Sequence, residues 1–110
     1  NFFRGVKMKY QQLKKIEKLM SISSRQFYPN LEEAFQKMLD TVGFLDKLDN
    51  TNRLDIINVL YNSGKRKCTY AQISSDLFMS DSKLRRTRIF FAECFEYFLN
   101  KVDNAASSAT

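Results

Sequence analysis

The chain has 110 residues, and its 18 Lys and Arg outnumber its 12 Asp and Glu, which gives a formal net charge of +6. This length holds one domain but not two independent cores, and a hydrophobic fraction of 44% excludes wholesale disorder. A single Pro and three Gly argue against a turn-rich β-sandwich or barrel, and no apolar run approaches the ~20 residues that span a bilayer.

The first part of the chain, residues 1–49, predicts two amphipathic helices. Apolar residues recur at steps of three or four over 5–20, which is the period of a helix with one buried face. A Ser-rich connector follows over 21–30. Asn30 is expected to cap the next helix, and Glu33, three residues later, completes a capping-box pattern.

The second part, residues 50–103, predicts short helices followed by a long one. A turn near Asn50 precedes a short helix, which should stop at Gly64 because glycine is favoured just after a helix end. No strand-like alternation competes over any useful length. The small polar residues 104–110 are expected to form a disordered tail. The sequence therefore predicts an all-α fold with a long last helix.

The positive charge is concentrated in two blocks. Residues 1–20 hold six cations against one carboxylate, and residues 65–88 hold seven against two. Between them, residues 21–64 hold four cations against six carboxylates. This pattern predicts a cationic face that favours phosphate backbones or anionic lipid. Ordinary solvated helix faces remain an alternative interpretation, chiefly for the first block.

The most informative stretch runs from Thr69 to Arg88. Thr69 and Gln72 have the spacing of a capping box, and Ser80 is a strong N-cap for a second helix. A short capped helix, a three-residue turn and a second capped helix form the helix-turn-helix pattern. Its buried positions fall on small or apolar residues, with a small residue where the two helices cross. These positions are Ile73, Ser74, Leu77, Met79 and Leu84.

The outward positions of the second helix carry the charge expected of a helix that enters the major groove of double-stranded DNA. Arg85 and Arg86 are expected to contact base edges, with Ser82 assisting. The residues predicted at the DNA surface are Lys65, Arg66, Lys67, Thr69, Tyr70, Gln72, Ser80, Asp81, Ser82, Lys83, Arg85, Arg86 and Arg88. Two residues depart from the pattern: Phe78 stands where the turn usually has glycine, and Thr87 where an apolar residue is usual. An ordinary packed helix pair with solvated cations is the alternative.

A family resemblance rests on the order of these elements. Arg53 to Tyr61 forms a helix, a basic link leads to the helix that starts after Thr69, and a long helix carries Phe91-Ala92-Glu93. In this order, residues 50–99 resemble phage transcriptional regulators of the ArpU and RinA type. More distantly, they are similar to the promoter-reading C-terminal domain of sigma factors. The resemblance covers under half of the chain and implies sequence-specific DNA binding that controls transcription.

The long last helix carries more apolar surface than one face can bury. One stripe runs through Leu84, Phe91, Phe95, Phe98 and Val102. A second column, formed by Phe90, Cys94 and Tyr97, lies beside it. We expect the stripe to lie inside each protomer and the column to contact a second copy in a homodimer, because paired helix-turn-helix units read two half-sites. Burial of both sets within one core is the alternative.

Catalytic and metal chemistry is not expected. The chain has no His, which removes His-based acid–base catalysis and His-containing metal sites, and it has no Gly-rich phosphate loop. Cys68 and Cys94 are far apart in sequence, and we expect free thiols in a reducing, cytoplasmic compartment. The sequence thus predicts a non-enzymatic regulator without cofactor, metal or membrane partner.

Two further functions stay open. One is a sigma-like module that binds both promoter DNA and RNA polymerase, which would need an additional upstream domain; the first residue is Asn1 rather than Met. The other is a helical interaction module whose cationic face binds an acidic partner or a membrane surface. Binding that weakens with salt but ignores the DNA sequence would favour this second alternative.

Overall fold

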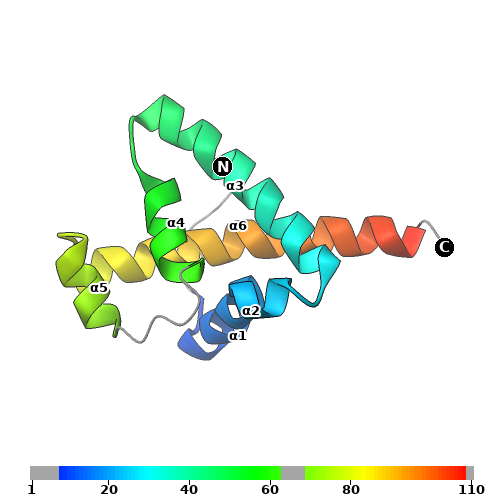
Figure 1. The fold of residues 1–110 in the computed structure, drawn as a ribbon, viewed down its shortest axis with the longest axis horizontal. Helices are drawn as coiled ribbons and strands as arrows, with labels where there is room; N and C mark the ends of the chain where they lie inside the picture. Colours follow the sequence, from blue (N-terminus) through cyan, green and yellow to red (C-terminus); the bar gives the residue numbers. More distant parts are fainter. Residues whose placement is uncertain (1–7, 63–68, 109–110) are drawn as a thin grey trace.

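The computed structural model describes residues 8–62 and 69–108, which fold into six helices and no strand (Figure 1). The helices are α1 (Tyr10–Met20), α2 (Ile22–Arg25), α3 (Pro29–Asp49), α4 (Arg53–Tyr61), α5 (Tyr70–Asp76) and α6 (Asp81–Ser108). The all-α prediction is confirmed, including the long last helix. None of the helices in the described ranges is both long and apolar enough to cross a membrane.

Helix α6 runs across the molecule and is the element on which the others pack. Figure 1 shows α3 crossing one side of α6, α1 and α2 on the other side, and α5 beside the start of α6. The largest buried side chains of the core are Phe35 of α3 and Phe91 and Phe95 of α6. The rings of Phe35 and Phe95 meet edge to face, with centroids 6.5 Å apart. Each such buried aromatic stabilises the fold by roughly 1.5–3 kcal/mol through apolar burial.

The two predicted parts of the chain share this core. Leu13 and Met20 of α1 are fully buried, as is Ile57 of α4, and all belong to one apolar cluster with the α6 residues. Residues 1–49 and 50–103 therefore do not form separate cores in the described chain, in agreement with the one-core limit that the length sets.

The start of α3 differs from the prediction. Residues 22–25 of the expected connector form α2, and α3 begins at Pro29 rather than after Asn30. Proline suits the first helical position because its ring fixes the helical φ and its missing N–H needs no partner there. The Asn30 side chain does not cap the helix but donates to Asp103 Oδ1 at 3.1 Å, so the predicted capping box with Glu33 is wrong.

Helix α3 continues through Gly43 and ends at Asp49, and the following residue, Asn50, has a φ of 55° in the left-handed region. The next helix, α4, is capped from outside by Asp46 of α3. Its carboxylate accepts hydrogen bonds from the backbone N–H of Arg53 at 3.1 Å and of Leu54 at 3.0 Å. Burial by itself would raise the pKa of Asp46, but hydrogen bonds to its carboxylate outweigh burial and lower it. The carboxylate is therefore charged and fixes the angle between α3 and α4.

The C-terminal prediction was wrong over residues 104–108, because α6 continues to Ser108. Val102 is buried and Asn30 of α3 holds Asp103, so tertiary contacts hold the helix where the small polar residues begin. Residues 109–110, like residues 5–7 of the first predicted helix and the expected stop at Gly64, lie outside the described residues.

Candidate nucleic-acid interface

The two helices of the informative stretch, α5 and α6, are joined by residues 77–80 and begin with the predicted caps. The backbone N–H of Gln72 donates to Thr69 Oγ1 at 3.2 Å, and that of Lys83 donates to Ser80 Oγ at 3.1 Å. The Gln72 side chain, however, donates to Asp76 Oδ1 at 2.9 Å. Each helix therefore starts at a hydroxyl residue that the sequence already indicates.

The turn between α5 and α6 passes through Phe78, which has a φ of 54°. Such a backbone conformation costs a residue with a side chain about 1–2 kcal/mol, which is why glycine is favoured there. Backbone hydrogen bonds hold the turn nevertheless, from Phe78 N to Ser75 O at 3.1 Å and from Met79 N to Ser74 O at 3.0 Å. The Phe78 ring is 97% exposed, so its packing does not compensate for the backbone cost.

The inward positions of this stretch are those that the sequence indicates. Ile73, Ser74 and Leu84 are buried, and Leu77 and Met79 are half-buried. Ser74 lies where α5 meets α6, and its hydroxyl is buried without a hydrogen-bond partner in the part of the chain that the structure describes. A small side chain at this position allows the two helices to approach.

The outward positions of α6 are exposed as predicted. These residues are Asp81, Ser82, Lys83, Arg85 and Arg86. They occupy the first two turns of α6 at a capped, solvent-facing helix start. Their exposure leaves the two arginines available for an external ligand.

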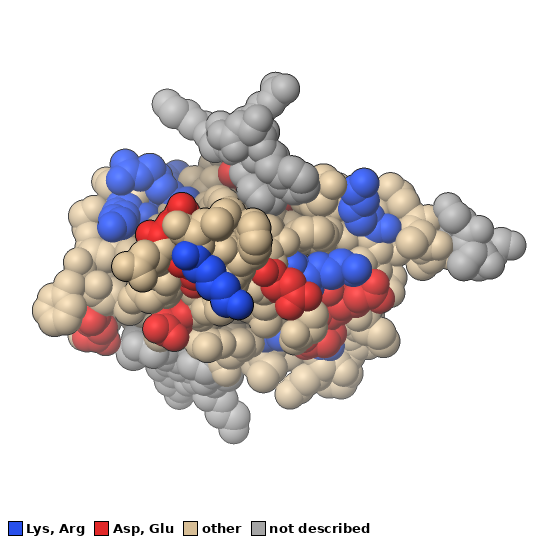
Figure 2. All heavy atoms as spheres, turned by 90° about the horizontal axis from the view of Figure 1, so that it is seen from above, with Lys and Arg blue, Asp and Glu red and all other residues tan. Residues whose placement is uncertain are grey.

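Helix α1 adds to this face. The Tyr10 ring has the Arg85 guanidinium carbon 5.9 Å from its centroid and the Lys14 ammonium 5.1 Å from it. The start of α1 therefore lies beside the start of α6, and the described parts of the two basic blocks meet. We call Tyr10, Lys14, Lys83, Arg85 and Arg86 the cationic surface. Figure 2, which views the side of α3, shows acidic and basic side chains interspersed over the middle of that side, with Lys or Arg gathered at the end where α6 begins.

Arg88 does not belong to this surface, and its predicted role at the DNA was wrong. The residue is buried, and its Nε and Nη2 both donate to the Glu17 carboxylate, with the Nε–Oε2 distance 3.0 Å. Its guanidinium stacks on the Tyr70 ring, 3.6 Å from the centroid. Burial by itself would lower the pKa of Arg88, but the hydrogen bonds and charge of Glu17 raise it.

Glu17 of α1 bonds directly to two other helices. Besides the contact with Arg88 of α6, its Oε2 accepts a hydrogen bond of 2.6 Å from the buried Tyr61 hydroxyl of α4, and α5 joins through the stacking of Tyr70 on Arg88. We call Glu17 of α1, Tyr61 of α4, Tyr70 of α5 and Arg88 of α6 the Glu17 cluster. Desolvation and the neighbouring carboxylate raise the pKa of Tyr61 well above its usual value, so its hydroxyl stays a donor. The Glu17–Arg88 pair joins α1 to α6, the two helices that carry the cationic surface, and thereby holds the two parts of that surface together.

The sequence contained a signal for this cluster. Glu17 follows Ile16 on the apolar stripe of α1, and the α6 stripe steps over seven residues from Leu84 to Phe91. Arg88 lies in that gap, four residues after Leu84 and three before Phe91, so helical geometry places it on the inward face. The neighbouring cations suggested that Arg88 is exposed, whereas its position relative to Leu84 and Phe91 around the helix indicated that it is buried.

The remaining residues predicted at the DNA surface differ in their surroundings. Tyr70 is 42% exposed, but one side of its ring is occupied by Arg88. Thr69, Gln72 and Ser80 are exposed at the start of α5 and of α6. The basic link Lys65, Arg66 and Lys67 lies outside the described residues.

The predicted dimer column on α6 is contradicted at Cys94, which is fully buried in the core. Helix α6 is packed by α3 on one side and by α1 on another, so more than one of its faces is covered. Burial raises the pKa of the Cys94 thiol to about 12. Phe90 and Tyr97 are half-buried. They contact the neighbouring rings of Phe91 and Phe98, at centroid distances of 5.8 and 5.2 Å.

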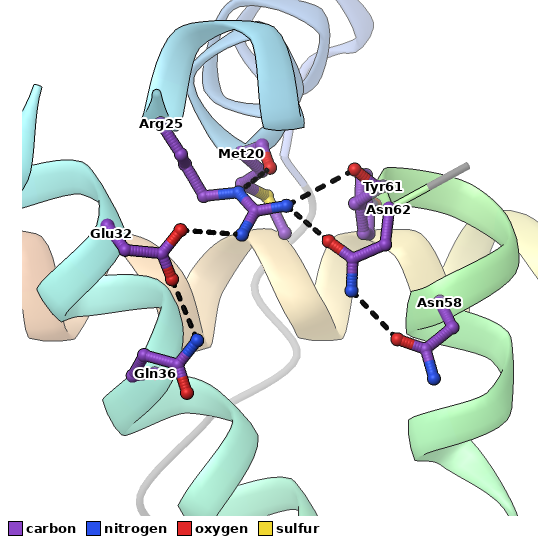
Figure 3. Close-up of polar contacts among 7 residues, drawn as sticks. All are labelled: Met20, Arg25, Glu32, Gln36, Asn58, Tyr61 and Asn62. Carbon is purple, nitrogen blue, oxygen red and sulfur yellow. Dashed lines mark hydrogen bonds and ion pairs between the residues drawn. The ribbon is translucent and has the colours of Figure 1, made fainter. Parts of the chain in front are cut away.

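A second buried cation, Arg25, was not indicated by the sequence because it lies in the expected connector. Figure 3 shows its guanidinium between α2, α3 and the end of α4. It donates to Met20 O at 2.8 Å, to Glu32 Oε1 at 3.0 Å, and to the side chain of Asn62. It also stacks on the Phe35 ring at 3.6 Å. Burial lowers the pKa of Arg25 from its very high ordinary value, with Glu32 opposing the shift. This cation therefore has a structural role.

Comparisons of the chain with protein-family models, curated proteins and solved structures find no match. The resemblance to the ArpU and RinA regulators stays a prediction. Within residues 8–62 and 69–108, no three His, Cys, Asp or Glu side chains gather as a metal site would require.

Proposed function

We propose that the chain is a sequence-specific DNA-binding regulator of transcription, from a phage or bacterium, which acts in the cytoplasm and is not an enzyme. In this proposal α5, the turn at Phe78 and α6 form a helix-turn-helix, and the first turns of α6 enter the major groove. The observation that carries the proposal is the exposure of Ser82, Arg85 and Arg86 together at the capped start of a helix that is otherwise anchored in the core.

The roles within this face follow from side-chain chemistry. Arg85 and Arg86 present planar, bidentate donors that match the O6 and N7 acceptors of guanine. Lys83 and Lys14 carry point charges at the edges of the same surface and suit phosphates, which position the protein without reading sequence. The Tyr10 ring contacts both the Lys14 ammonium and the Arg85 guanidinium, so it would help to direct the two cations to one duplex.

Homodimerisation is a further part of the proposal, whereas contact with RNA polymerase belongs to the alternative of a sigma-like module that binds both promoter DNA and the polymerase. A single helix-turn-helix buries little surface on DNA, and a second copy would double the contacts. Phe90 and Tyr97 remain the candidate dimer residues, because both are partly exposed on one long helix, whereas Cys94 is not available. Sedimentation of wild type and of Tyr97→Glu tests this part separately.

Selection of bound sites from a pool of random DNA duplexes tests the central proposal. An enriched motif is the expected result, and a palindromic motif would additionally support two copies. Binding that falls with salt but enriches no motif would contradict sequence-specific recognition. That result would instead favour the alternative that the chain is an interaction module whose basic face binds an acidic partner.

A further inference from the structure

The strongest unassigned surface is a groove between α3 and α4, with a volume of about 630 Å³. Its apolar lining includes Leu39 and Phe44 of α3 and Leu54 of α4. Phe44 is 61% exposed, and Leu48, one helical turn further along α3, is 65% exposed. Bulky apolar side chains four residues apart on one helix form a continuous strip, and such exposed strips are typical of interaction sites.

The groove is rimmed by carboxylates although the protein as a whole is basic. Asp40 on α3 and Asp55 on α4 are exposed on its two walls, and Asp46 lies at the junction. Among the residues that line the groove, Asp40, Asp46 and Asp55 stand against one cation, Lys47, whereas the chain as a whole is +6. The local field therefore repels DNA and attracts a cationic ligand.

The groove is also held open in a fixed shape. Asp46 hydrogen-bonds the first backbone N–H groups of α4, and Thr51 Oγ1 donates to the same carboxylate at 2.6 Å. At Gly43 the Leu54 side chain of α4 packs on α3, and an added Cβ would lie 3.4 Å from Leu54 Cδ1, at van der Waals contact. A groove whose walls are fixed in this way binds a ligand with little ordering cost.

We infer that this groove binds an amphipathic segment of a partner protein, one that presents bulky apolar residues flanked by Lys or Arg. A segment suits the groove because the exposed apolar strip consists of two side chains, Phe44 and Leu48, whereas a stable interface between two proteins involves roughly 20–30 residues a side. In Figure 1 the end of α3 and helix α1 lie on opposite sides of α6. A segment in the groove would thus lie across α6 from the α1 residues of the cationic surface. The inference does not depend on the proposed DNA binding.

Selection of random peptides displayed on phage against the intact protein tests the inference. The enriched peptides should share two apolar residues at helical spacing with adjacent Lys or Arg. A synthetic copy of the most enriched peptide should then bind wild type in fluorescence anisotropy, and high salt should weaken its binding. Phe44→Ser should raise its Kd at least ~10-fold, since anchor residues in a groove supply most of the affinity.

Phe27→Ser is the matched control, because Phe27 is 75% exposed in the link between α2 and α3, away from the groove. It should leave the Kd of the peptide within about twofold, a change of under 0.5 kcal/mol. Enriched peptides without a cationic bias, binding unaffected by Phe44→Ser, or no enriched peptide would each overturn the inference. So would a wild-type dimer that Phe44→Ser dissociates, since the occupant would then be a second copy. Phe44→Ser should retain wild-type DNA affinity, so a failure of DNA binding is distinguishable.

Discussion

Two corners of the molecule turn the chain through a non-glycine residue in the left-handed region. Asn50, with a φ of 55°, joins α3 to α4, and Phe78, with a φ of 54°, joins α5 to α6. The second helix of each corner receives a cap from a different source: Ser80 caps α6 locally, whereas Asp46 caps α4 from four residues before the turn. Each corner thus uses a left-handed residue, but the helix that follows is capped by the residue just before it at one corner and by a side chain of the preceding helix at the other.

The corners also differ in what their arginines do. At the α3–α4 corner, Arg53 is half-exposed and pairs with Asp49 at 3.1 Å. At the α5–α6 corner, Arg85 and Arg86 face solvent while Arg88, two residues further, is buried against Glu17. The number of nearby cations does not distinguish the exposed arginines from the buried one, but the face of the helix on which each arginine lies does. The α3–α4 corner therefore presents carboxylates to solvent, and the α5–α6 corner presents cations.

The largest expected effect comes from the buried arginine. Arg88→Met should lower the free energy of unfolding by about 3–5 kcal/mol, because it leaves the Glu17 carboxylate buried without its cation. Arg53→Met, at the other corner, should cost under about 1 kcal/mol, since partly exposed ion pairs contribute little. Urea unfolding followed by circular dichroism measures both variants.

The double variant Glu17→Met/Arg88→Met sharpens this test. It removes both charges and should recover part of the loss, leaving the Tyr61 hydroxyl as the unpaired group, at a cost of about 1–3 kcal/mol. If Arg88→Met and Arg53→Met lowered the free energy of unfolding equally, the buried ion pair of Arg88 with Glu17 would not stabilise the α5–α6 corner more than the exposed pair stabilises the other.

The second prediction concerns the exposed arginines. Arg85→Ala or Arg86→Ala should each weaken binding to the selected DNA site by about 1–3 kcal/mol and relax base preference at one position. Lys47→Ala removes a cation from the α3–α4 corner and should leave DNA affinity nearly unchanged. Electrophoretic mobility shifts on the selected site and on random DNA measure both effects. Equal losses on the two DNAs would make the arginines phosphate contacts only.

Features that depend on neighbouring residues were predictable from the sequence. The caps at Thr69 and Ser80 follow from residue type and spacing, and so does the buried set that includes Ile73 and Leu84. Helical content likewise follows from apolar periodicity, which does not require knowledge of the partner surface. For the same reason the outward set on α6 could be named before its surroundings were known.

Features that depend on distant partners were not predictable in the same way. Glu17 and Arg88 are 71 positions apart, so neither residue type nor local spacing identifies them as a pair. The sequence prediction placed Cys94 on a dimer surface, although it is buried in the core. The sequence does not show how many helices pack around α6, because that is a property of the tertiary fold. Asn30 has a good capping residue type, but Pro29 and the contact with Asp103 decide the start of α3.

The third prediction compares the two caps. Asp46→Ala should cost about 2 kcal/mol, because hydrogen bonds from two backbone N–H groups and from Thr51 lose a charged acceptor. Ser80→Ala removes one cap at a solvent-exposed helix start and should cost about 1 kcal/mol. Urea midpoints of the two variants at neutral pH measure the difference.

The two caps should also differ in pH dependence. The pKa of Asp46 is lowered in the folded protein from its ordinary value of 3.8. Its contribution to stability is therefore complete above that value and is lost as the pH falls through the folded pKa. The gap between wild type and Asp46→Ala should narrow below about pH 4, whereas the gap for Ser80→Ala should stay constant. A constant gap for both would exclude a charged cap at Asp46.

The smallest effect is expected at the turn residues themselves. Phe78→Gly removes a left-handed strain of about 1–2 kcal/mol, and the added freedom of the unfolded chain opposes this by about 0.5–1 kcal/mol. Because the ring is 97% exposed, little packing is lost, and we expect a net stabilisation of about 0.5–1 kcal/mol. Asn50→Gly should change stability by less than about 0.5 kcal/mol, since asparagine already tolerates this conformation.

Phe78→Val completes this comparison, because a β-branched residue is the least compatible with a positive φ. Its unfolding free energy should lie about 1–2 kcal/mol below that of Phe78→Gly, and thermal and urea unfolding of the same samples should agree on the order. If Phe78→Gly were instead less stable than wild type, the exposed ring would have to contribute a contact. The corner would then be held by its aromatic side chain as well as by the backbone hydrogen bonds of residues 77–79. If Phe78→Gly is more stable than wild type and binds DNA equally well, the Phe78 ring contributes neither to stability nor to DNA binding.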